Sequence, residues 1–246
     1  MTSLAEQTTI VVGASRGLGR GVAEVLAQAG APVVTVSRTD GHAGGADRSK
    51  AIHTEVADAR DEGLPARLID QFAPTNIVIV AGAVPHMSPL QDQSWETFSL
   101  AWETDVRITF SWVREALLRP LQSGGKVIVF SSGAALGGSP LSGGYAGAKA
   151  TQRFVTDYAR WESDKANLGI AFSSIMSKFA PDTGVGKAAV AAYSAEAGMP
   201  VDEFLSKQGP LLSPEGAGTA VVDLLQRKAA DIAASYLLNG AGLRAL

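Results

Sequence analysis

The chain enters regular structure at Thr9-Ile-Val-Val12, and Gly13-Ala-Ser-Arg-Gly17-Leu-Gly19 follows at once. The apolar run predicts a buried strand, and the glycines predict a sharp turn into a helix. A backbone that approaches a pyrophosphate closely cannot carry side chains at every position, and a helix N-terminus offers free N–H groups to phosphates. The turn is therefore a candidate dinucleotide site; the other interpretation is an ordinary strand-to-helix turn. The candidate cofactor-binding residues in it are Gly13, Ser15, Arg16, Gly17, Leu18 and Gly19.

Short apolar runs alternate with amphipathic segments along the rest of the chain. The runs are rich in Val and Ile and show little polar alternation, which is typical of parallel strands covered on both faces. We expect strands at residues 8–12, 32–36, 52–56, 76–80, 126–130, 171–176 and 235–238, and helices near 22–29, 61–71, 95–118, 144–163 and 214–227. The pattern predicts an α/β fold, a doubly wound parallel sheet of about seven strands with helices on both faces. We expect a single domain over residues 1–246, with a small substrate lid around 179–211.

Composition excludes several classes of function. The 246 residues include no cysteine, which rules out thiol chemistry, disulfides and cysteine-ligated zinc, and the three scattered histidines predict no metal site. A net charge of −3, with acids and bases interspersed, does not favour nucleic acid or an anionic membrane as a partner. No apolar run reaches the roughly 20 residues that span a bilayer, and the N-terminus lacks the features of a secretion signal. We therefore expect a cytoplasmic protein.

A second motif lies in the middle of the chain. Tyr145 and Lys149 stand four residues apart in Tyr-Ala-Gly-Ala-Lys, and Ser132 lies thirteen residues before the tyrosine. On a helix, positions i and i+4 share a face, so the phenol and the ammonium can address the same point. A lysine cation stabilises a phenolate, and a serine hydroxyl can donate to a carbonyl oxygen. These groups suit proton transfer during hydride exchange between a carbonyl and an alcohol; the alternative is a solvated pair on a helix surface.

Arg38 follows the second expected strand and bears on the choice of cofactor. An acidic residue here would accept the ribose 2′-hydroxyl of NAD, but the strand ends Thr35-Val-Ser37-Arg38. The guanidinium of Arg38 can bind a 2′-phosphate through charge-assisted hydrogen bonds, with Ser37 adding a donor and Arg16 a further positive charge. We predict NADP(H) as the cofactor; the alternative is that both arginines are solvated loop charges.

Taken together, Gly13-x-x-x-Gly17-x-Gly19, Ser132 and Tyr145-x-x-x-Lys149 resemble the motifs of the short-chain dehydrogenase/reductase family, over essentially the whole chain. The resemblance implies an extended Rossmann fold of seven strands and a nicotinamide cofactor. It implies that Tyr145 is the catalytic acid/base and also contacts the cofactor, that Lys149 activates it and binds the ribose, and that Ser132 holds the substrate oxygen. Members of the family commonly associate through helices like 95–118 and 144–163, so a homodimer or homotetramer is expected.

Three segments depart from the family's pattern. The Asn-Ala-Gly usual after the fourth strand lacks its Asn, and a Ser-Lys-Phe-Ala-Pro segment replaces the Pro-Gly usual after the sixth strand. The Asp that the family commonly places near the adenine is a Glu here, longer by one methylene. The resemblance still implies cofactor contacts at these places, by Glu55, Val56, Ala81, Gly82 and Thr183, the last with the nicotinamide carboxamide.

Asp105 falls on the apolar stripe of the expected helix 95–118, where the family commonly has an Asn that holds a water linked to the lysine. A buried carboxylate is unfavourable unless it is neutral, paired or hydrogen-bonded. Our hypothesis is that Asp105 keeps the relay role and couples electrostatically to Lys149; the alternative is a solvated carboxylate, or one that caps a helical kink. The candidate catalytic residues are thus Ser132, Tyr145, Lys149 and Asp105.

Two functions remain open from the sequence. The first is an NADP(H)-dependent oxidoreductase that interconverts a small-molecule carbonyl and alcohol, and the intact Ser132, Tyr145 and Lys149 favour it. The second is a non-catalytic nucleotide-binding redox sensor or interaction protein on the same fold, for which the missing Asn and the replaced Pro-Gly leave room.

Overall fold

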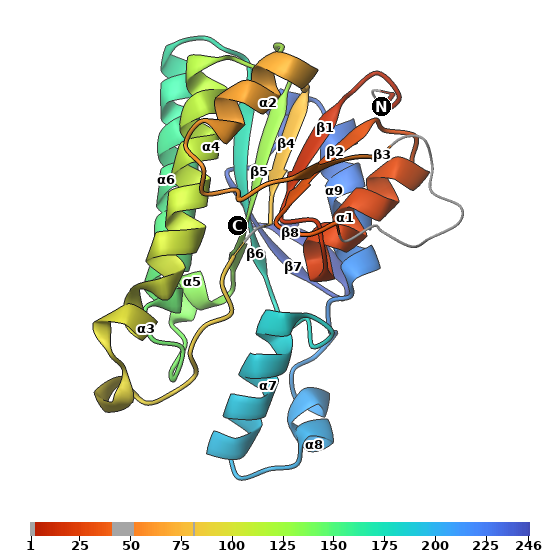
Figure 1. Cartoon of the computed structure of the whole chain (residues 1–246). Helices are drawn as coiled ribbons and strands as arrows, with labels where there is room; N and C mark the ends of the chain where they lie inside the picture. Colours follow the sequence, from red (N-terminus) through yellow and green to blue (C-terminus); the bar gives the residue numbers. More distant parts are fainter. Residues whose placement is uncertain (1–2, 41–51, 81) are drawn as a thin grey trace.

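The computed structural model describes residues 3–40, 52–80 and 82–246, and these residues form one sheet with helices on both faces (Figure 1). The strand order is β3-β2-β1-β4-β5-β6-β7-β8. Strands β1 to β7 pair in parallel, and β8 pairs antiparallel with β7. The chain moves outward on both sides of β1, so the doubly wound parallel sheet predicted from the sequence is confirmed. The strands are β1 (Thr9–Val12), β2 (Val33–Ser37), β3 (Ile52–Val56), β4 (Asn76–Ile79), β5 (Lys126–Ser132), β6 (Ala171–Ser177), β7 (Ser235–Asn239) and β8 (Gly242–Ala245).

Two layers of helices cover the sheet, α1 and α9 on one face and α2, α4 and α6 on the other (Figure 1). Alternate residues of each strand supply the two cores. Val11 packs in the cluster of Val22 and Val221, whereas Ile10 belongs to the cluster of Trp112 on the opposite face. Because the central strands are buried on both faces, their sequences are largely continuous apolar runs. These helices are α1 (Gly17–Gln28), α2 (Leu64–Phe72), α4 (Arg107–Leu118), α6 (Tyr145–Lys165) and α9 (Pro214–Gln226).

The structure differs from the sequence prediction at the helix expected over residues 95–118. That segment divides into α3 (Trp95–Ala101), a π-helical turn η2 (Trp102–Val106) and α4. Buried Gln152 of α6 supports the wider turn, since its amide donates to the backbone oxygen of Asp105 at 3.2 Å and to Thr109 Oγ1 at 2.6 Å. The spacing of apolar residues within the segment cannot predict this wider turn, because the turn depends on a side chain from another helix.

The strand β8 was also not predicted, so the sheet has eight strands where about seven were expected. Its four residues, Gly-Leu-Arg-Ala, contain no apolar run, and it lies at the edge of the sheet, largely exposed. An edge strand needs only one hydrogen-bonded neighbour and no two-sided burial, so the sequence carries little signal for it.

The segment expected as a lid contains two helices, α7 (Gly184–Glu196) and α8 (Val201–Ser206), which project beyond the carboxyl ends of the strands (Figure 1). A short helix, α5 (Ala134–Gly137), follows β5 at the same end of the sheet. Within the described residues, every helix is too short or too polar to cross a bilayer.

Candidate functional site

A cavity of about 830 Å³ opens at the carboxyl ends of the parallel strands. Ligands of open α/β sheets bind at this edge, and the volume lies in the range of roughly 300–1,000 Å³ that small-molecule sites occupy. The wall comes from the turn after β1, the ends of β2, β5 and β6, and the first turns of α6 and α7. The predicted residues that line it are Gly13, Ser15, Arg16, Gly17, Leu18, Gly19, Ser37, Arg38, Gly82, Asp105, Ser132, Tyr145, Lys149 and Thr183.

The glycine turn has steric reasons for its composition. Gly13 adopts φ 91°, in the region that side chains disfavour. A Cβ at Gly19 would collide with the carbonyl oxygen of Gly13, so the first turn of α1 packs directly against the end of β1. The N-terminus of α1 thereby lies at the wall of the cavity, with its backbone N–H groups close to the end of β1. This geometry fits the pyrophosphate of a dinucleotide.

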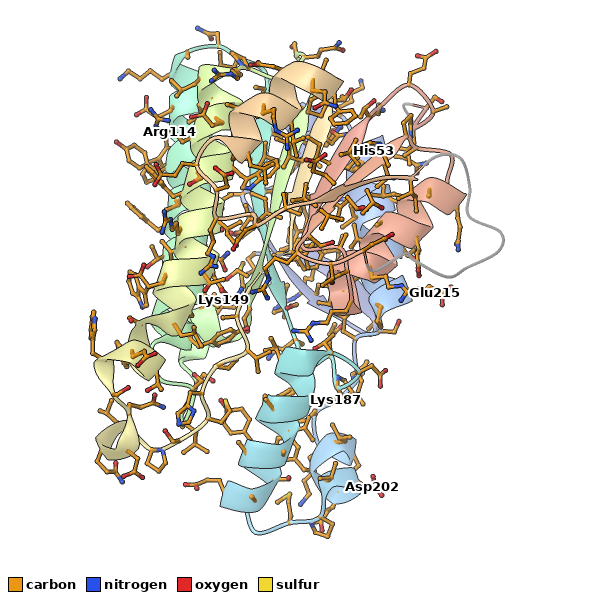
Figure 2. The ribbon with its side chains drawn as sticks, viewed as in Figure 1. His53, Arg114, Lys149, Lys187, Asp202 and Glu215 are labelled. Carbon is orange, nitrogen blue, oxygen red and sulfur yellow. The ribbon has the colours of Figure 1, made fainter. Side chains whose placement is uncertain are left out.

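Ser132, Tyr145 and Lys149 line the same cavity. Tyr145 is the first residue of α6, half-buried, and the Nζ of Lys149 lies 5.4 Å from the centroid of its ring. The Oγ of Ser132 accepts from the backbone N–H of Ala134 at 3.2 Å, which leaves the hydroxyl hydrogen to donate. The buried lysine, labelled in Figure 2, is fixed through its backbone, whose oxygen accepts from Ser131 Oγ at 2.8 Å. The cavity therefore holds a phenol, a hydroxyl donor and a cation together.

Asp105 forms an ion pair with Lys149. Its Oδ2 lies 2.9 Å from the lysine Nζ, and its Oδ1 accepts from the backbone N–H of Ala83 at 2.7 Å. The carboxylate is 0% exposed. The 2.9 Å separation leaves no room for a water between the two charged atoms, so the coupling that the sequence predicted is a direct contact here rather than a water-bridged one. The alternative of a solvated Asp105 is wrong.

The ion pair controls the charge state of Lys149. Burial lowers the pKa of this ammonium, but the Asp105 charge, Tyr145 and the hydrogen bond with Asp105 act in the opposite direction, and the pKa is raised overall. Lys149 is thus protonated at neutral pH, and a carboxylate balances its positive charge locally. Space for that carboxylate depends on Gly82, where a Cβ would lie 2.9 Å from the Asp105 Oδ2.

At the far end of the cavity, Arg38 is exposed and lies near the carboxylate of Asp58. The pKa of Asp58 is lowered to about 2, first by a side-chain hydrogen bond from Arg60 and in small part by the Arg38 charge. The hydroxyl of Ser37 donates to the backbone oxygen of Thr39 at 2.7 Å, so the donor predicted from this serine is already used. Two guanidinium groups and one carboxylate leave this end positive.

Arg16 departs from its predicted surroundings. Its guanidinium carbon lies 3.9 Å from the position of a Cβ at Gly184, the first residue of α7. The side chain therefore reaches across the cavity from the glycine turn to α7. Within residues 3–40, 52–80 and 82–246, the charged side chains that line the cavity comprise five positive ones (Arg16, Arg38, Arg60, Lys149 and Lys178) and two negative ones (Asp58 and Asp105). This imbalance suits an anionic ligand such as a dinucleotide.

Several predicted cofactor contacts are not supported by the geometry. Glu55 and Val56 do not line the cavity, because β3 continues through Val56 and only the residues after it reach the edge of the sheet. The carboxylate of Glu55 instead pairs with Arg67 of α2. The hydroxyl of Thr183 donates to the Ala180 oxygen and accepts from Gly186 N–H as the N-cap of α7, so it is engaged on both sides. Ala81 lies outside the described residues.

Some lining residues were not among the predicted catalytic or cofactor-binding residues. Asp58 and Arg60 follow β3, Lys178 follows β6, and the hydroxyls of Ser139 and Tyr193 contact each other across the cavity. For Asp58, Arg60 and Lys178, the available signal in the sequence was their position after the end of a strand. The Ser139–Tyr193 contact joins the loop after β5 to α7, and no residue spacing in the sequence predicts it.

We predict that Asp105→Ala lowers the free energy of unfolding by about 3 kcal/mol, because it leaves the buried Lys149 ammonium without a counter-ion. Urea unfolding at neutral pH measures this loss. The raised pKa of Lys149 means that the stabilisation is fully present below the unfolded pKa, near 10.5, and is lost as the pH rises through the folded value.

The matched control is Glu203→Ala, which removes an exposed ion pair with Lys207 (2.7 Å), expected to cost under about 1 kcal/mol. Equal losses in the two variants would contradict the assignment of a buried, stabilising pair.

Comparisons with known proteins bear on this site. The 2,5-dichloro-2,5-cyclohexadiene-1,4-diol dehydrogenase of Sphingobium indicum is 30% identical over 159 residues, 61% of this chain and 63% of that protein. The hydroxynaphthalene reductase-like protein Arp2 of Metarhizium majus is 28% identical over 171 residues, 63% of this chain and 64% of that protein. The matches thus span less than two thirds of these curated relatives.

Two solved structures share the fold over nearly the whole chain. A short chain dehydrogenase family protein from Francisella tularensis superposes with a TM-score of 0.78 at 19% identity, covering 96% of this chain and 98% of the other. ElxO with NADP bound gives 0.79 at 18% identity, with the same coverage. The short chain dehydrogenase family model matches residues 7–194, which include the glycine turn, Ser132, Tyr145 and Lys149. The chain belongs to the short-chain dehydrogenase family.

Proposed function

We propose that the protein is an NADP(H)-dependent oxidoreductase that interconverts a small-molecule carbonyl and its alcohol. The observation that carries the proposal is that Ser132, Tyr145 and Lys149 line the same cavity as the glycine turn, with the Lys149 ammonium beside the Tyr145 ring. A hydroxyl donor, a phenol and a buried cation are the groups needed to hold a carbonyl oxygen and to deliver a proton to it.

In the reduction direction, Ser132 donates a hydrogen bond to the carbonyl oxygen and fixes its position. When bound, the nicotinamide ring supplies the hydride that adds to the carbonyl carbon. Tyr145 gives its phenolic proton to the oxygen as negative charge develops there, and the alcohol O–H bond forms as the phenol O–H bond breaks. The resulting phenolate is stabilised by the Lys149 ammonium and by the N-terminus of α6, whose first residue is Tyr145.

Asp105 acts on this site through Lys149. We propose that it is a positioning residue, which keeps the lysine protonated and holds the ammonium under the tyrosine ring. The same carboxylate cancels part of the positive charge that favours the phenolate. The enzyme therefore needs a higher pH to form the phenolate that accepts the proton in alcohol oxidation than it would with a neutral amide at position 105.

The preference for NADP(H) rests on the positive end of the cavity. Arg38 and Arg60 lie there, and Asp58 is the one carboxylate at this end among the described lining residues; a 2′-phosphate carries the complementary charge. The NADP-bound state of one structural relative is consistent with this choice.

The second candidate function, nucleotide binding without turnover, is favoured by one observation. Asp105 already holds the Lys149 ammonium, which the family resemblance assigns to the ribose and to the tyrosine. Reaction rates, rather than cofactor binding, therefore separate the two functions.

We also propose that the segment 179–211 is a lid and that the protein self-associates. The outer face of α6 exposes contacting aromatic rings of Phe154, Tyr158 and Trp161, between 53% and 61% exposed, which a second copy would cover. Sedimentation equilibrium gives the number of chains, and a monomer at high micromolar concentration would contradict this proposal.

We expect Tyr145→Phe to lower kcat/KM for carbonyl reduction by about 100- to 10,000-fold, because the proton donor is lost while the ring remains. The measurement is NADPH consumption with a panel of aldehydes and ketones. Tyr158→Phe, exposed on the same helix, is the control and should keep its activity. Thermal shift with NADP should be unchanged in both variants, and turnover that survives in Tyr145→Phe would exclude the mechanism.

Arg38→Ala should raise the Michaelis constant for NADPH by about 10- to 100-fold and that for NADH by less than about threefold, since only NADPH presents a 2′-phosphate. Initial-rate kinetics with both cofactors measure this. Arg20→Ala removes a cation of α1 that does not line the cavity, and it should change neither constant. Parallel changes for the two cofactors would refute the assignment of Arg38.

Asp105→Asn should move the half-maximal pH of alcohol oxidation down by on the order of one unit, because the Lys149 charge is no longer balanced beside the phenol. The pH profile of kcat with NADP measures the shift. Glu203→Gln, a distant carboxylate-to-amide change, controls for net charge. A profile that coincides with that of the unmodified enzyme would remove Asp105 from the site's electrostatics.

A further inference from the structure

We propose that the substrate carries a carboxylate and that the ammonium of Lys178 binds it beside Ser132. This inference deepens the proposed function, on which it rests, by naming a chemical class of substrate. Lys178 stands where the segment after β6 departs from the family's usual Pro-Gly, and its side chain lines the cavity.

The pairing of β5 with β6 sets the position of Lys178. Ser132 is in register with Ser177, and the backbone N–H of Gly133 donates to the Ser177 oxygen at 2.9 Å. The residue after Ser177 therefore lies next to the residue after Ser132. The backbone of Lys178 is fixed as well, because its N–H donates to the Leu238 oxygen at 2.8 Å.

The stem of the lysine packs over Gly133. Its Cδ and Cε lie 3.4 Å and 3.8 Å from the position that a Cβ at Gly133 would take. These are ordinary van der Waals distances, and the ammonium is one bond further on. Since Gly133 directly follows Ser132, a group held by this ammonium sits next to a substrate oxygen held by the serine.

The ammonium of Lys178 takes no part in the proposed catalysis or cofactor binding. Among the described residues that line the cavity, Asp58 is paired with Arg60 and Asp105 with Lys149, and no ion pair or side-chain hydrogen bond involves the Lys178 Nζ. Arg38 serves the opposite end, and the glycine turn with the N-terminus of α1 suits the pyrophosphate. Lys178 thus adds a positive charge that the proposed contacts to the pyrophosphate and the 2′-phosphate do not use.

The chemistry favours a carboxylate over a phosphate. A single ammonium balances one negative charge, whereas phosphate sites commonly gather several donors, often from arginine or a helix N-terminus. The remaining wall is largely apolar here, with Phe179 packed edge-on against Tyr193 at 6.3 Å between ring centroids. A compact aromatic or aliphatic carbonyl compound with one carboxylate fits this combination.

The test compares phenylglyoxylate with its uncharged methyl ester as substrates with NADPH; in both, the acid or ester group is bonded directly to the reacting carbonyl carbon. We expect the acid to have at least a tenfold higher kcat/KM than the ester. Lys178→Met should lower kcat/KM for the acid by about 10- to 100-fold and change that for the ester by less than threefold. Lys187→Met is the matched control, an exposed lysine of α7 that does not line the cavity (Figure 2).

A binding measurement separates this inference from the proposed function. Titration calorimetry with benzoate and benzamide, on protein saturated with NADP, should show tighter binding of benzoate that Lys178→Met abolishes and Lys187→Met keeps. That result without turnover of any aldehyde would support the anion site and overturn the proposed catalysis. Equal binding of the two probes, or equal effects of the two lysine variants, would overturn the anion site, whatever the catalytic activity.

Discussion

The buried contact between Asp105 and Lys149 is the constraint on which the candidate site depends. It joins the π-helical turn before α4, the first turns of α6 and, through the Ala83 N–H, the segment after β4. An unpaired charge in this position would be strongly unfavourable, so loss of either partner destabilises the packing of the three segments. The pair also fixes the position of the cation beside the Tyr145 ring.

The same contact gives the site an unusual charge balance. At the catalytic wall a carboxylate offsets the lysine, whereas the two ends of the cavity keep an excess of arginine and lysine. Positive charge is thus concentrated at the ends of the cavity and is reduced beside Tyr145. This arrangement favours an anionic ligand at the ends of the cavity.

Much of the fold could be predicted because its signals are local. Buried parallel strands such as residues 9–12 need apolar runs, and a strand-to-helix turn that approaches its own carbonyl needs glycine at position 19. The divided helix at 95–118 could not be predicted, because Gln152 of a different helix holds the wider turn. Glu55 was assigned to the adenine by resemblance, but its partner is Arg67, whose position depends on how α2 packs.

The amino-acid order alone determined the fold class and which residue types gather at one edge of the sheet, since periodicity and the ends of strands are properties of the local chain. Only the tertiary structure decided the partners: Asp105 with Lys149, Ser37 with Thr39, Thr183 as a helix cap, and Lys178 without a counter-ion among the described residues. The physical reason is that electrostatic pairing and hydrogen bonding depend on distances of a few ångströms between segments far apart in the chain, and no sequence spacing encodes those distances.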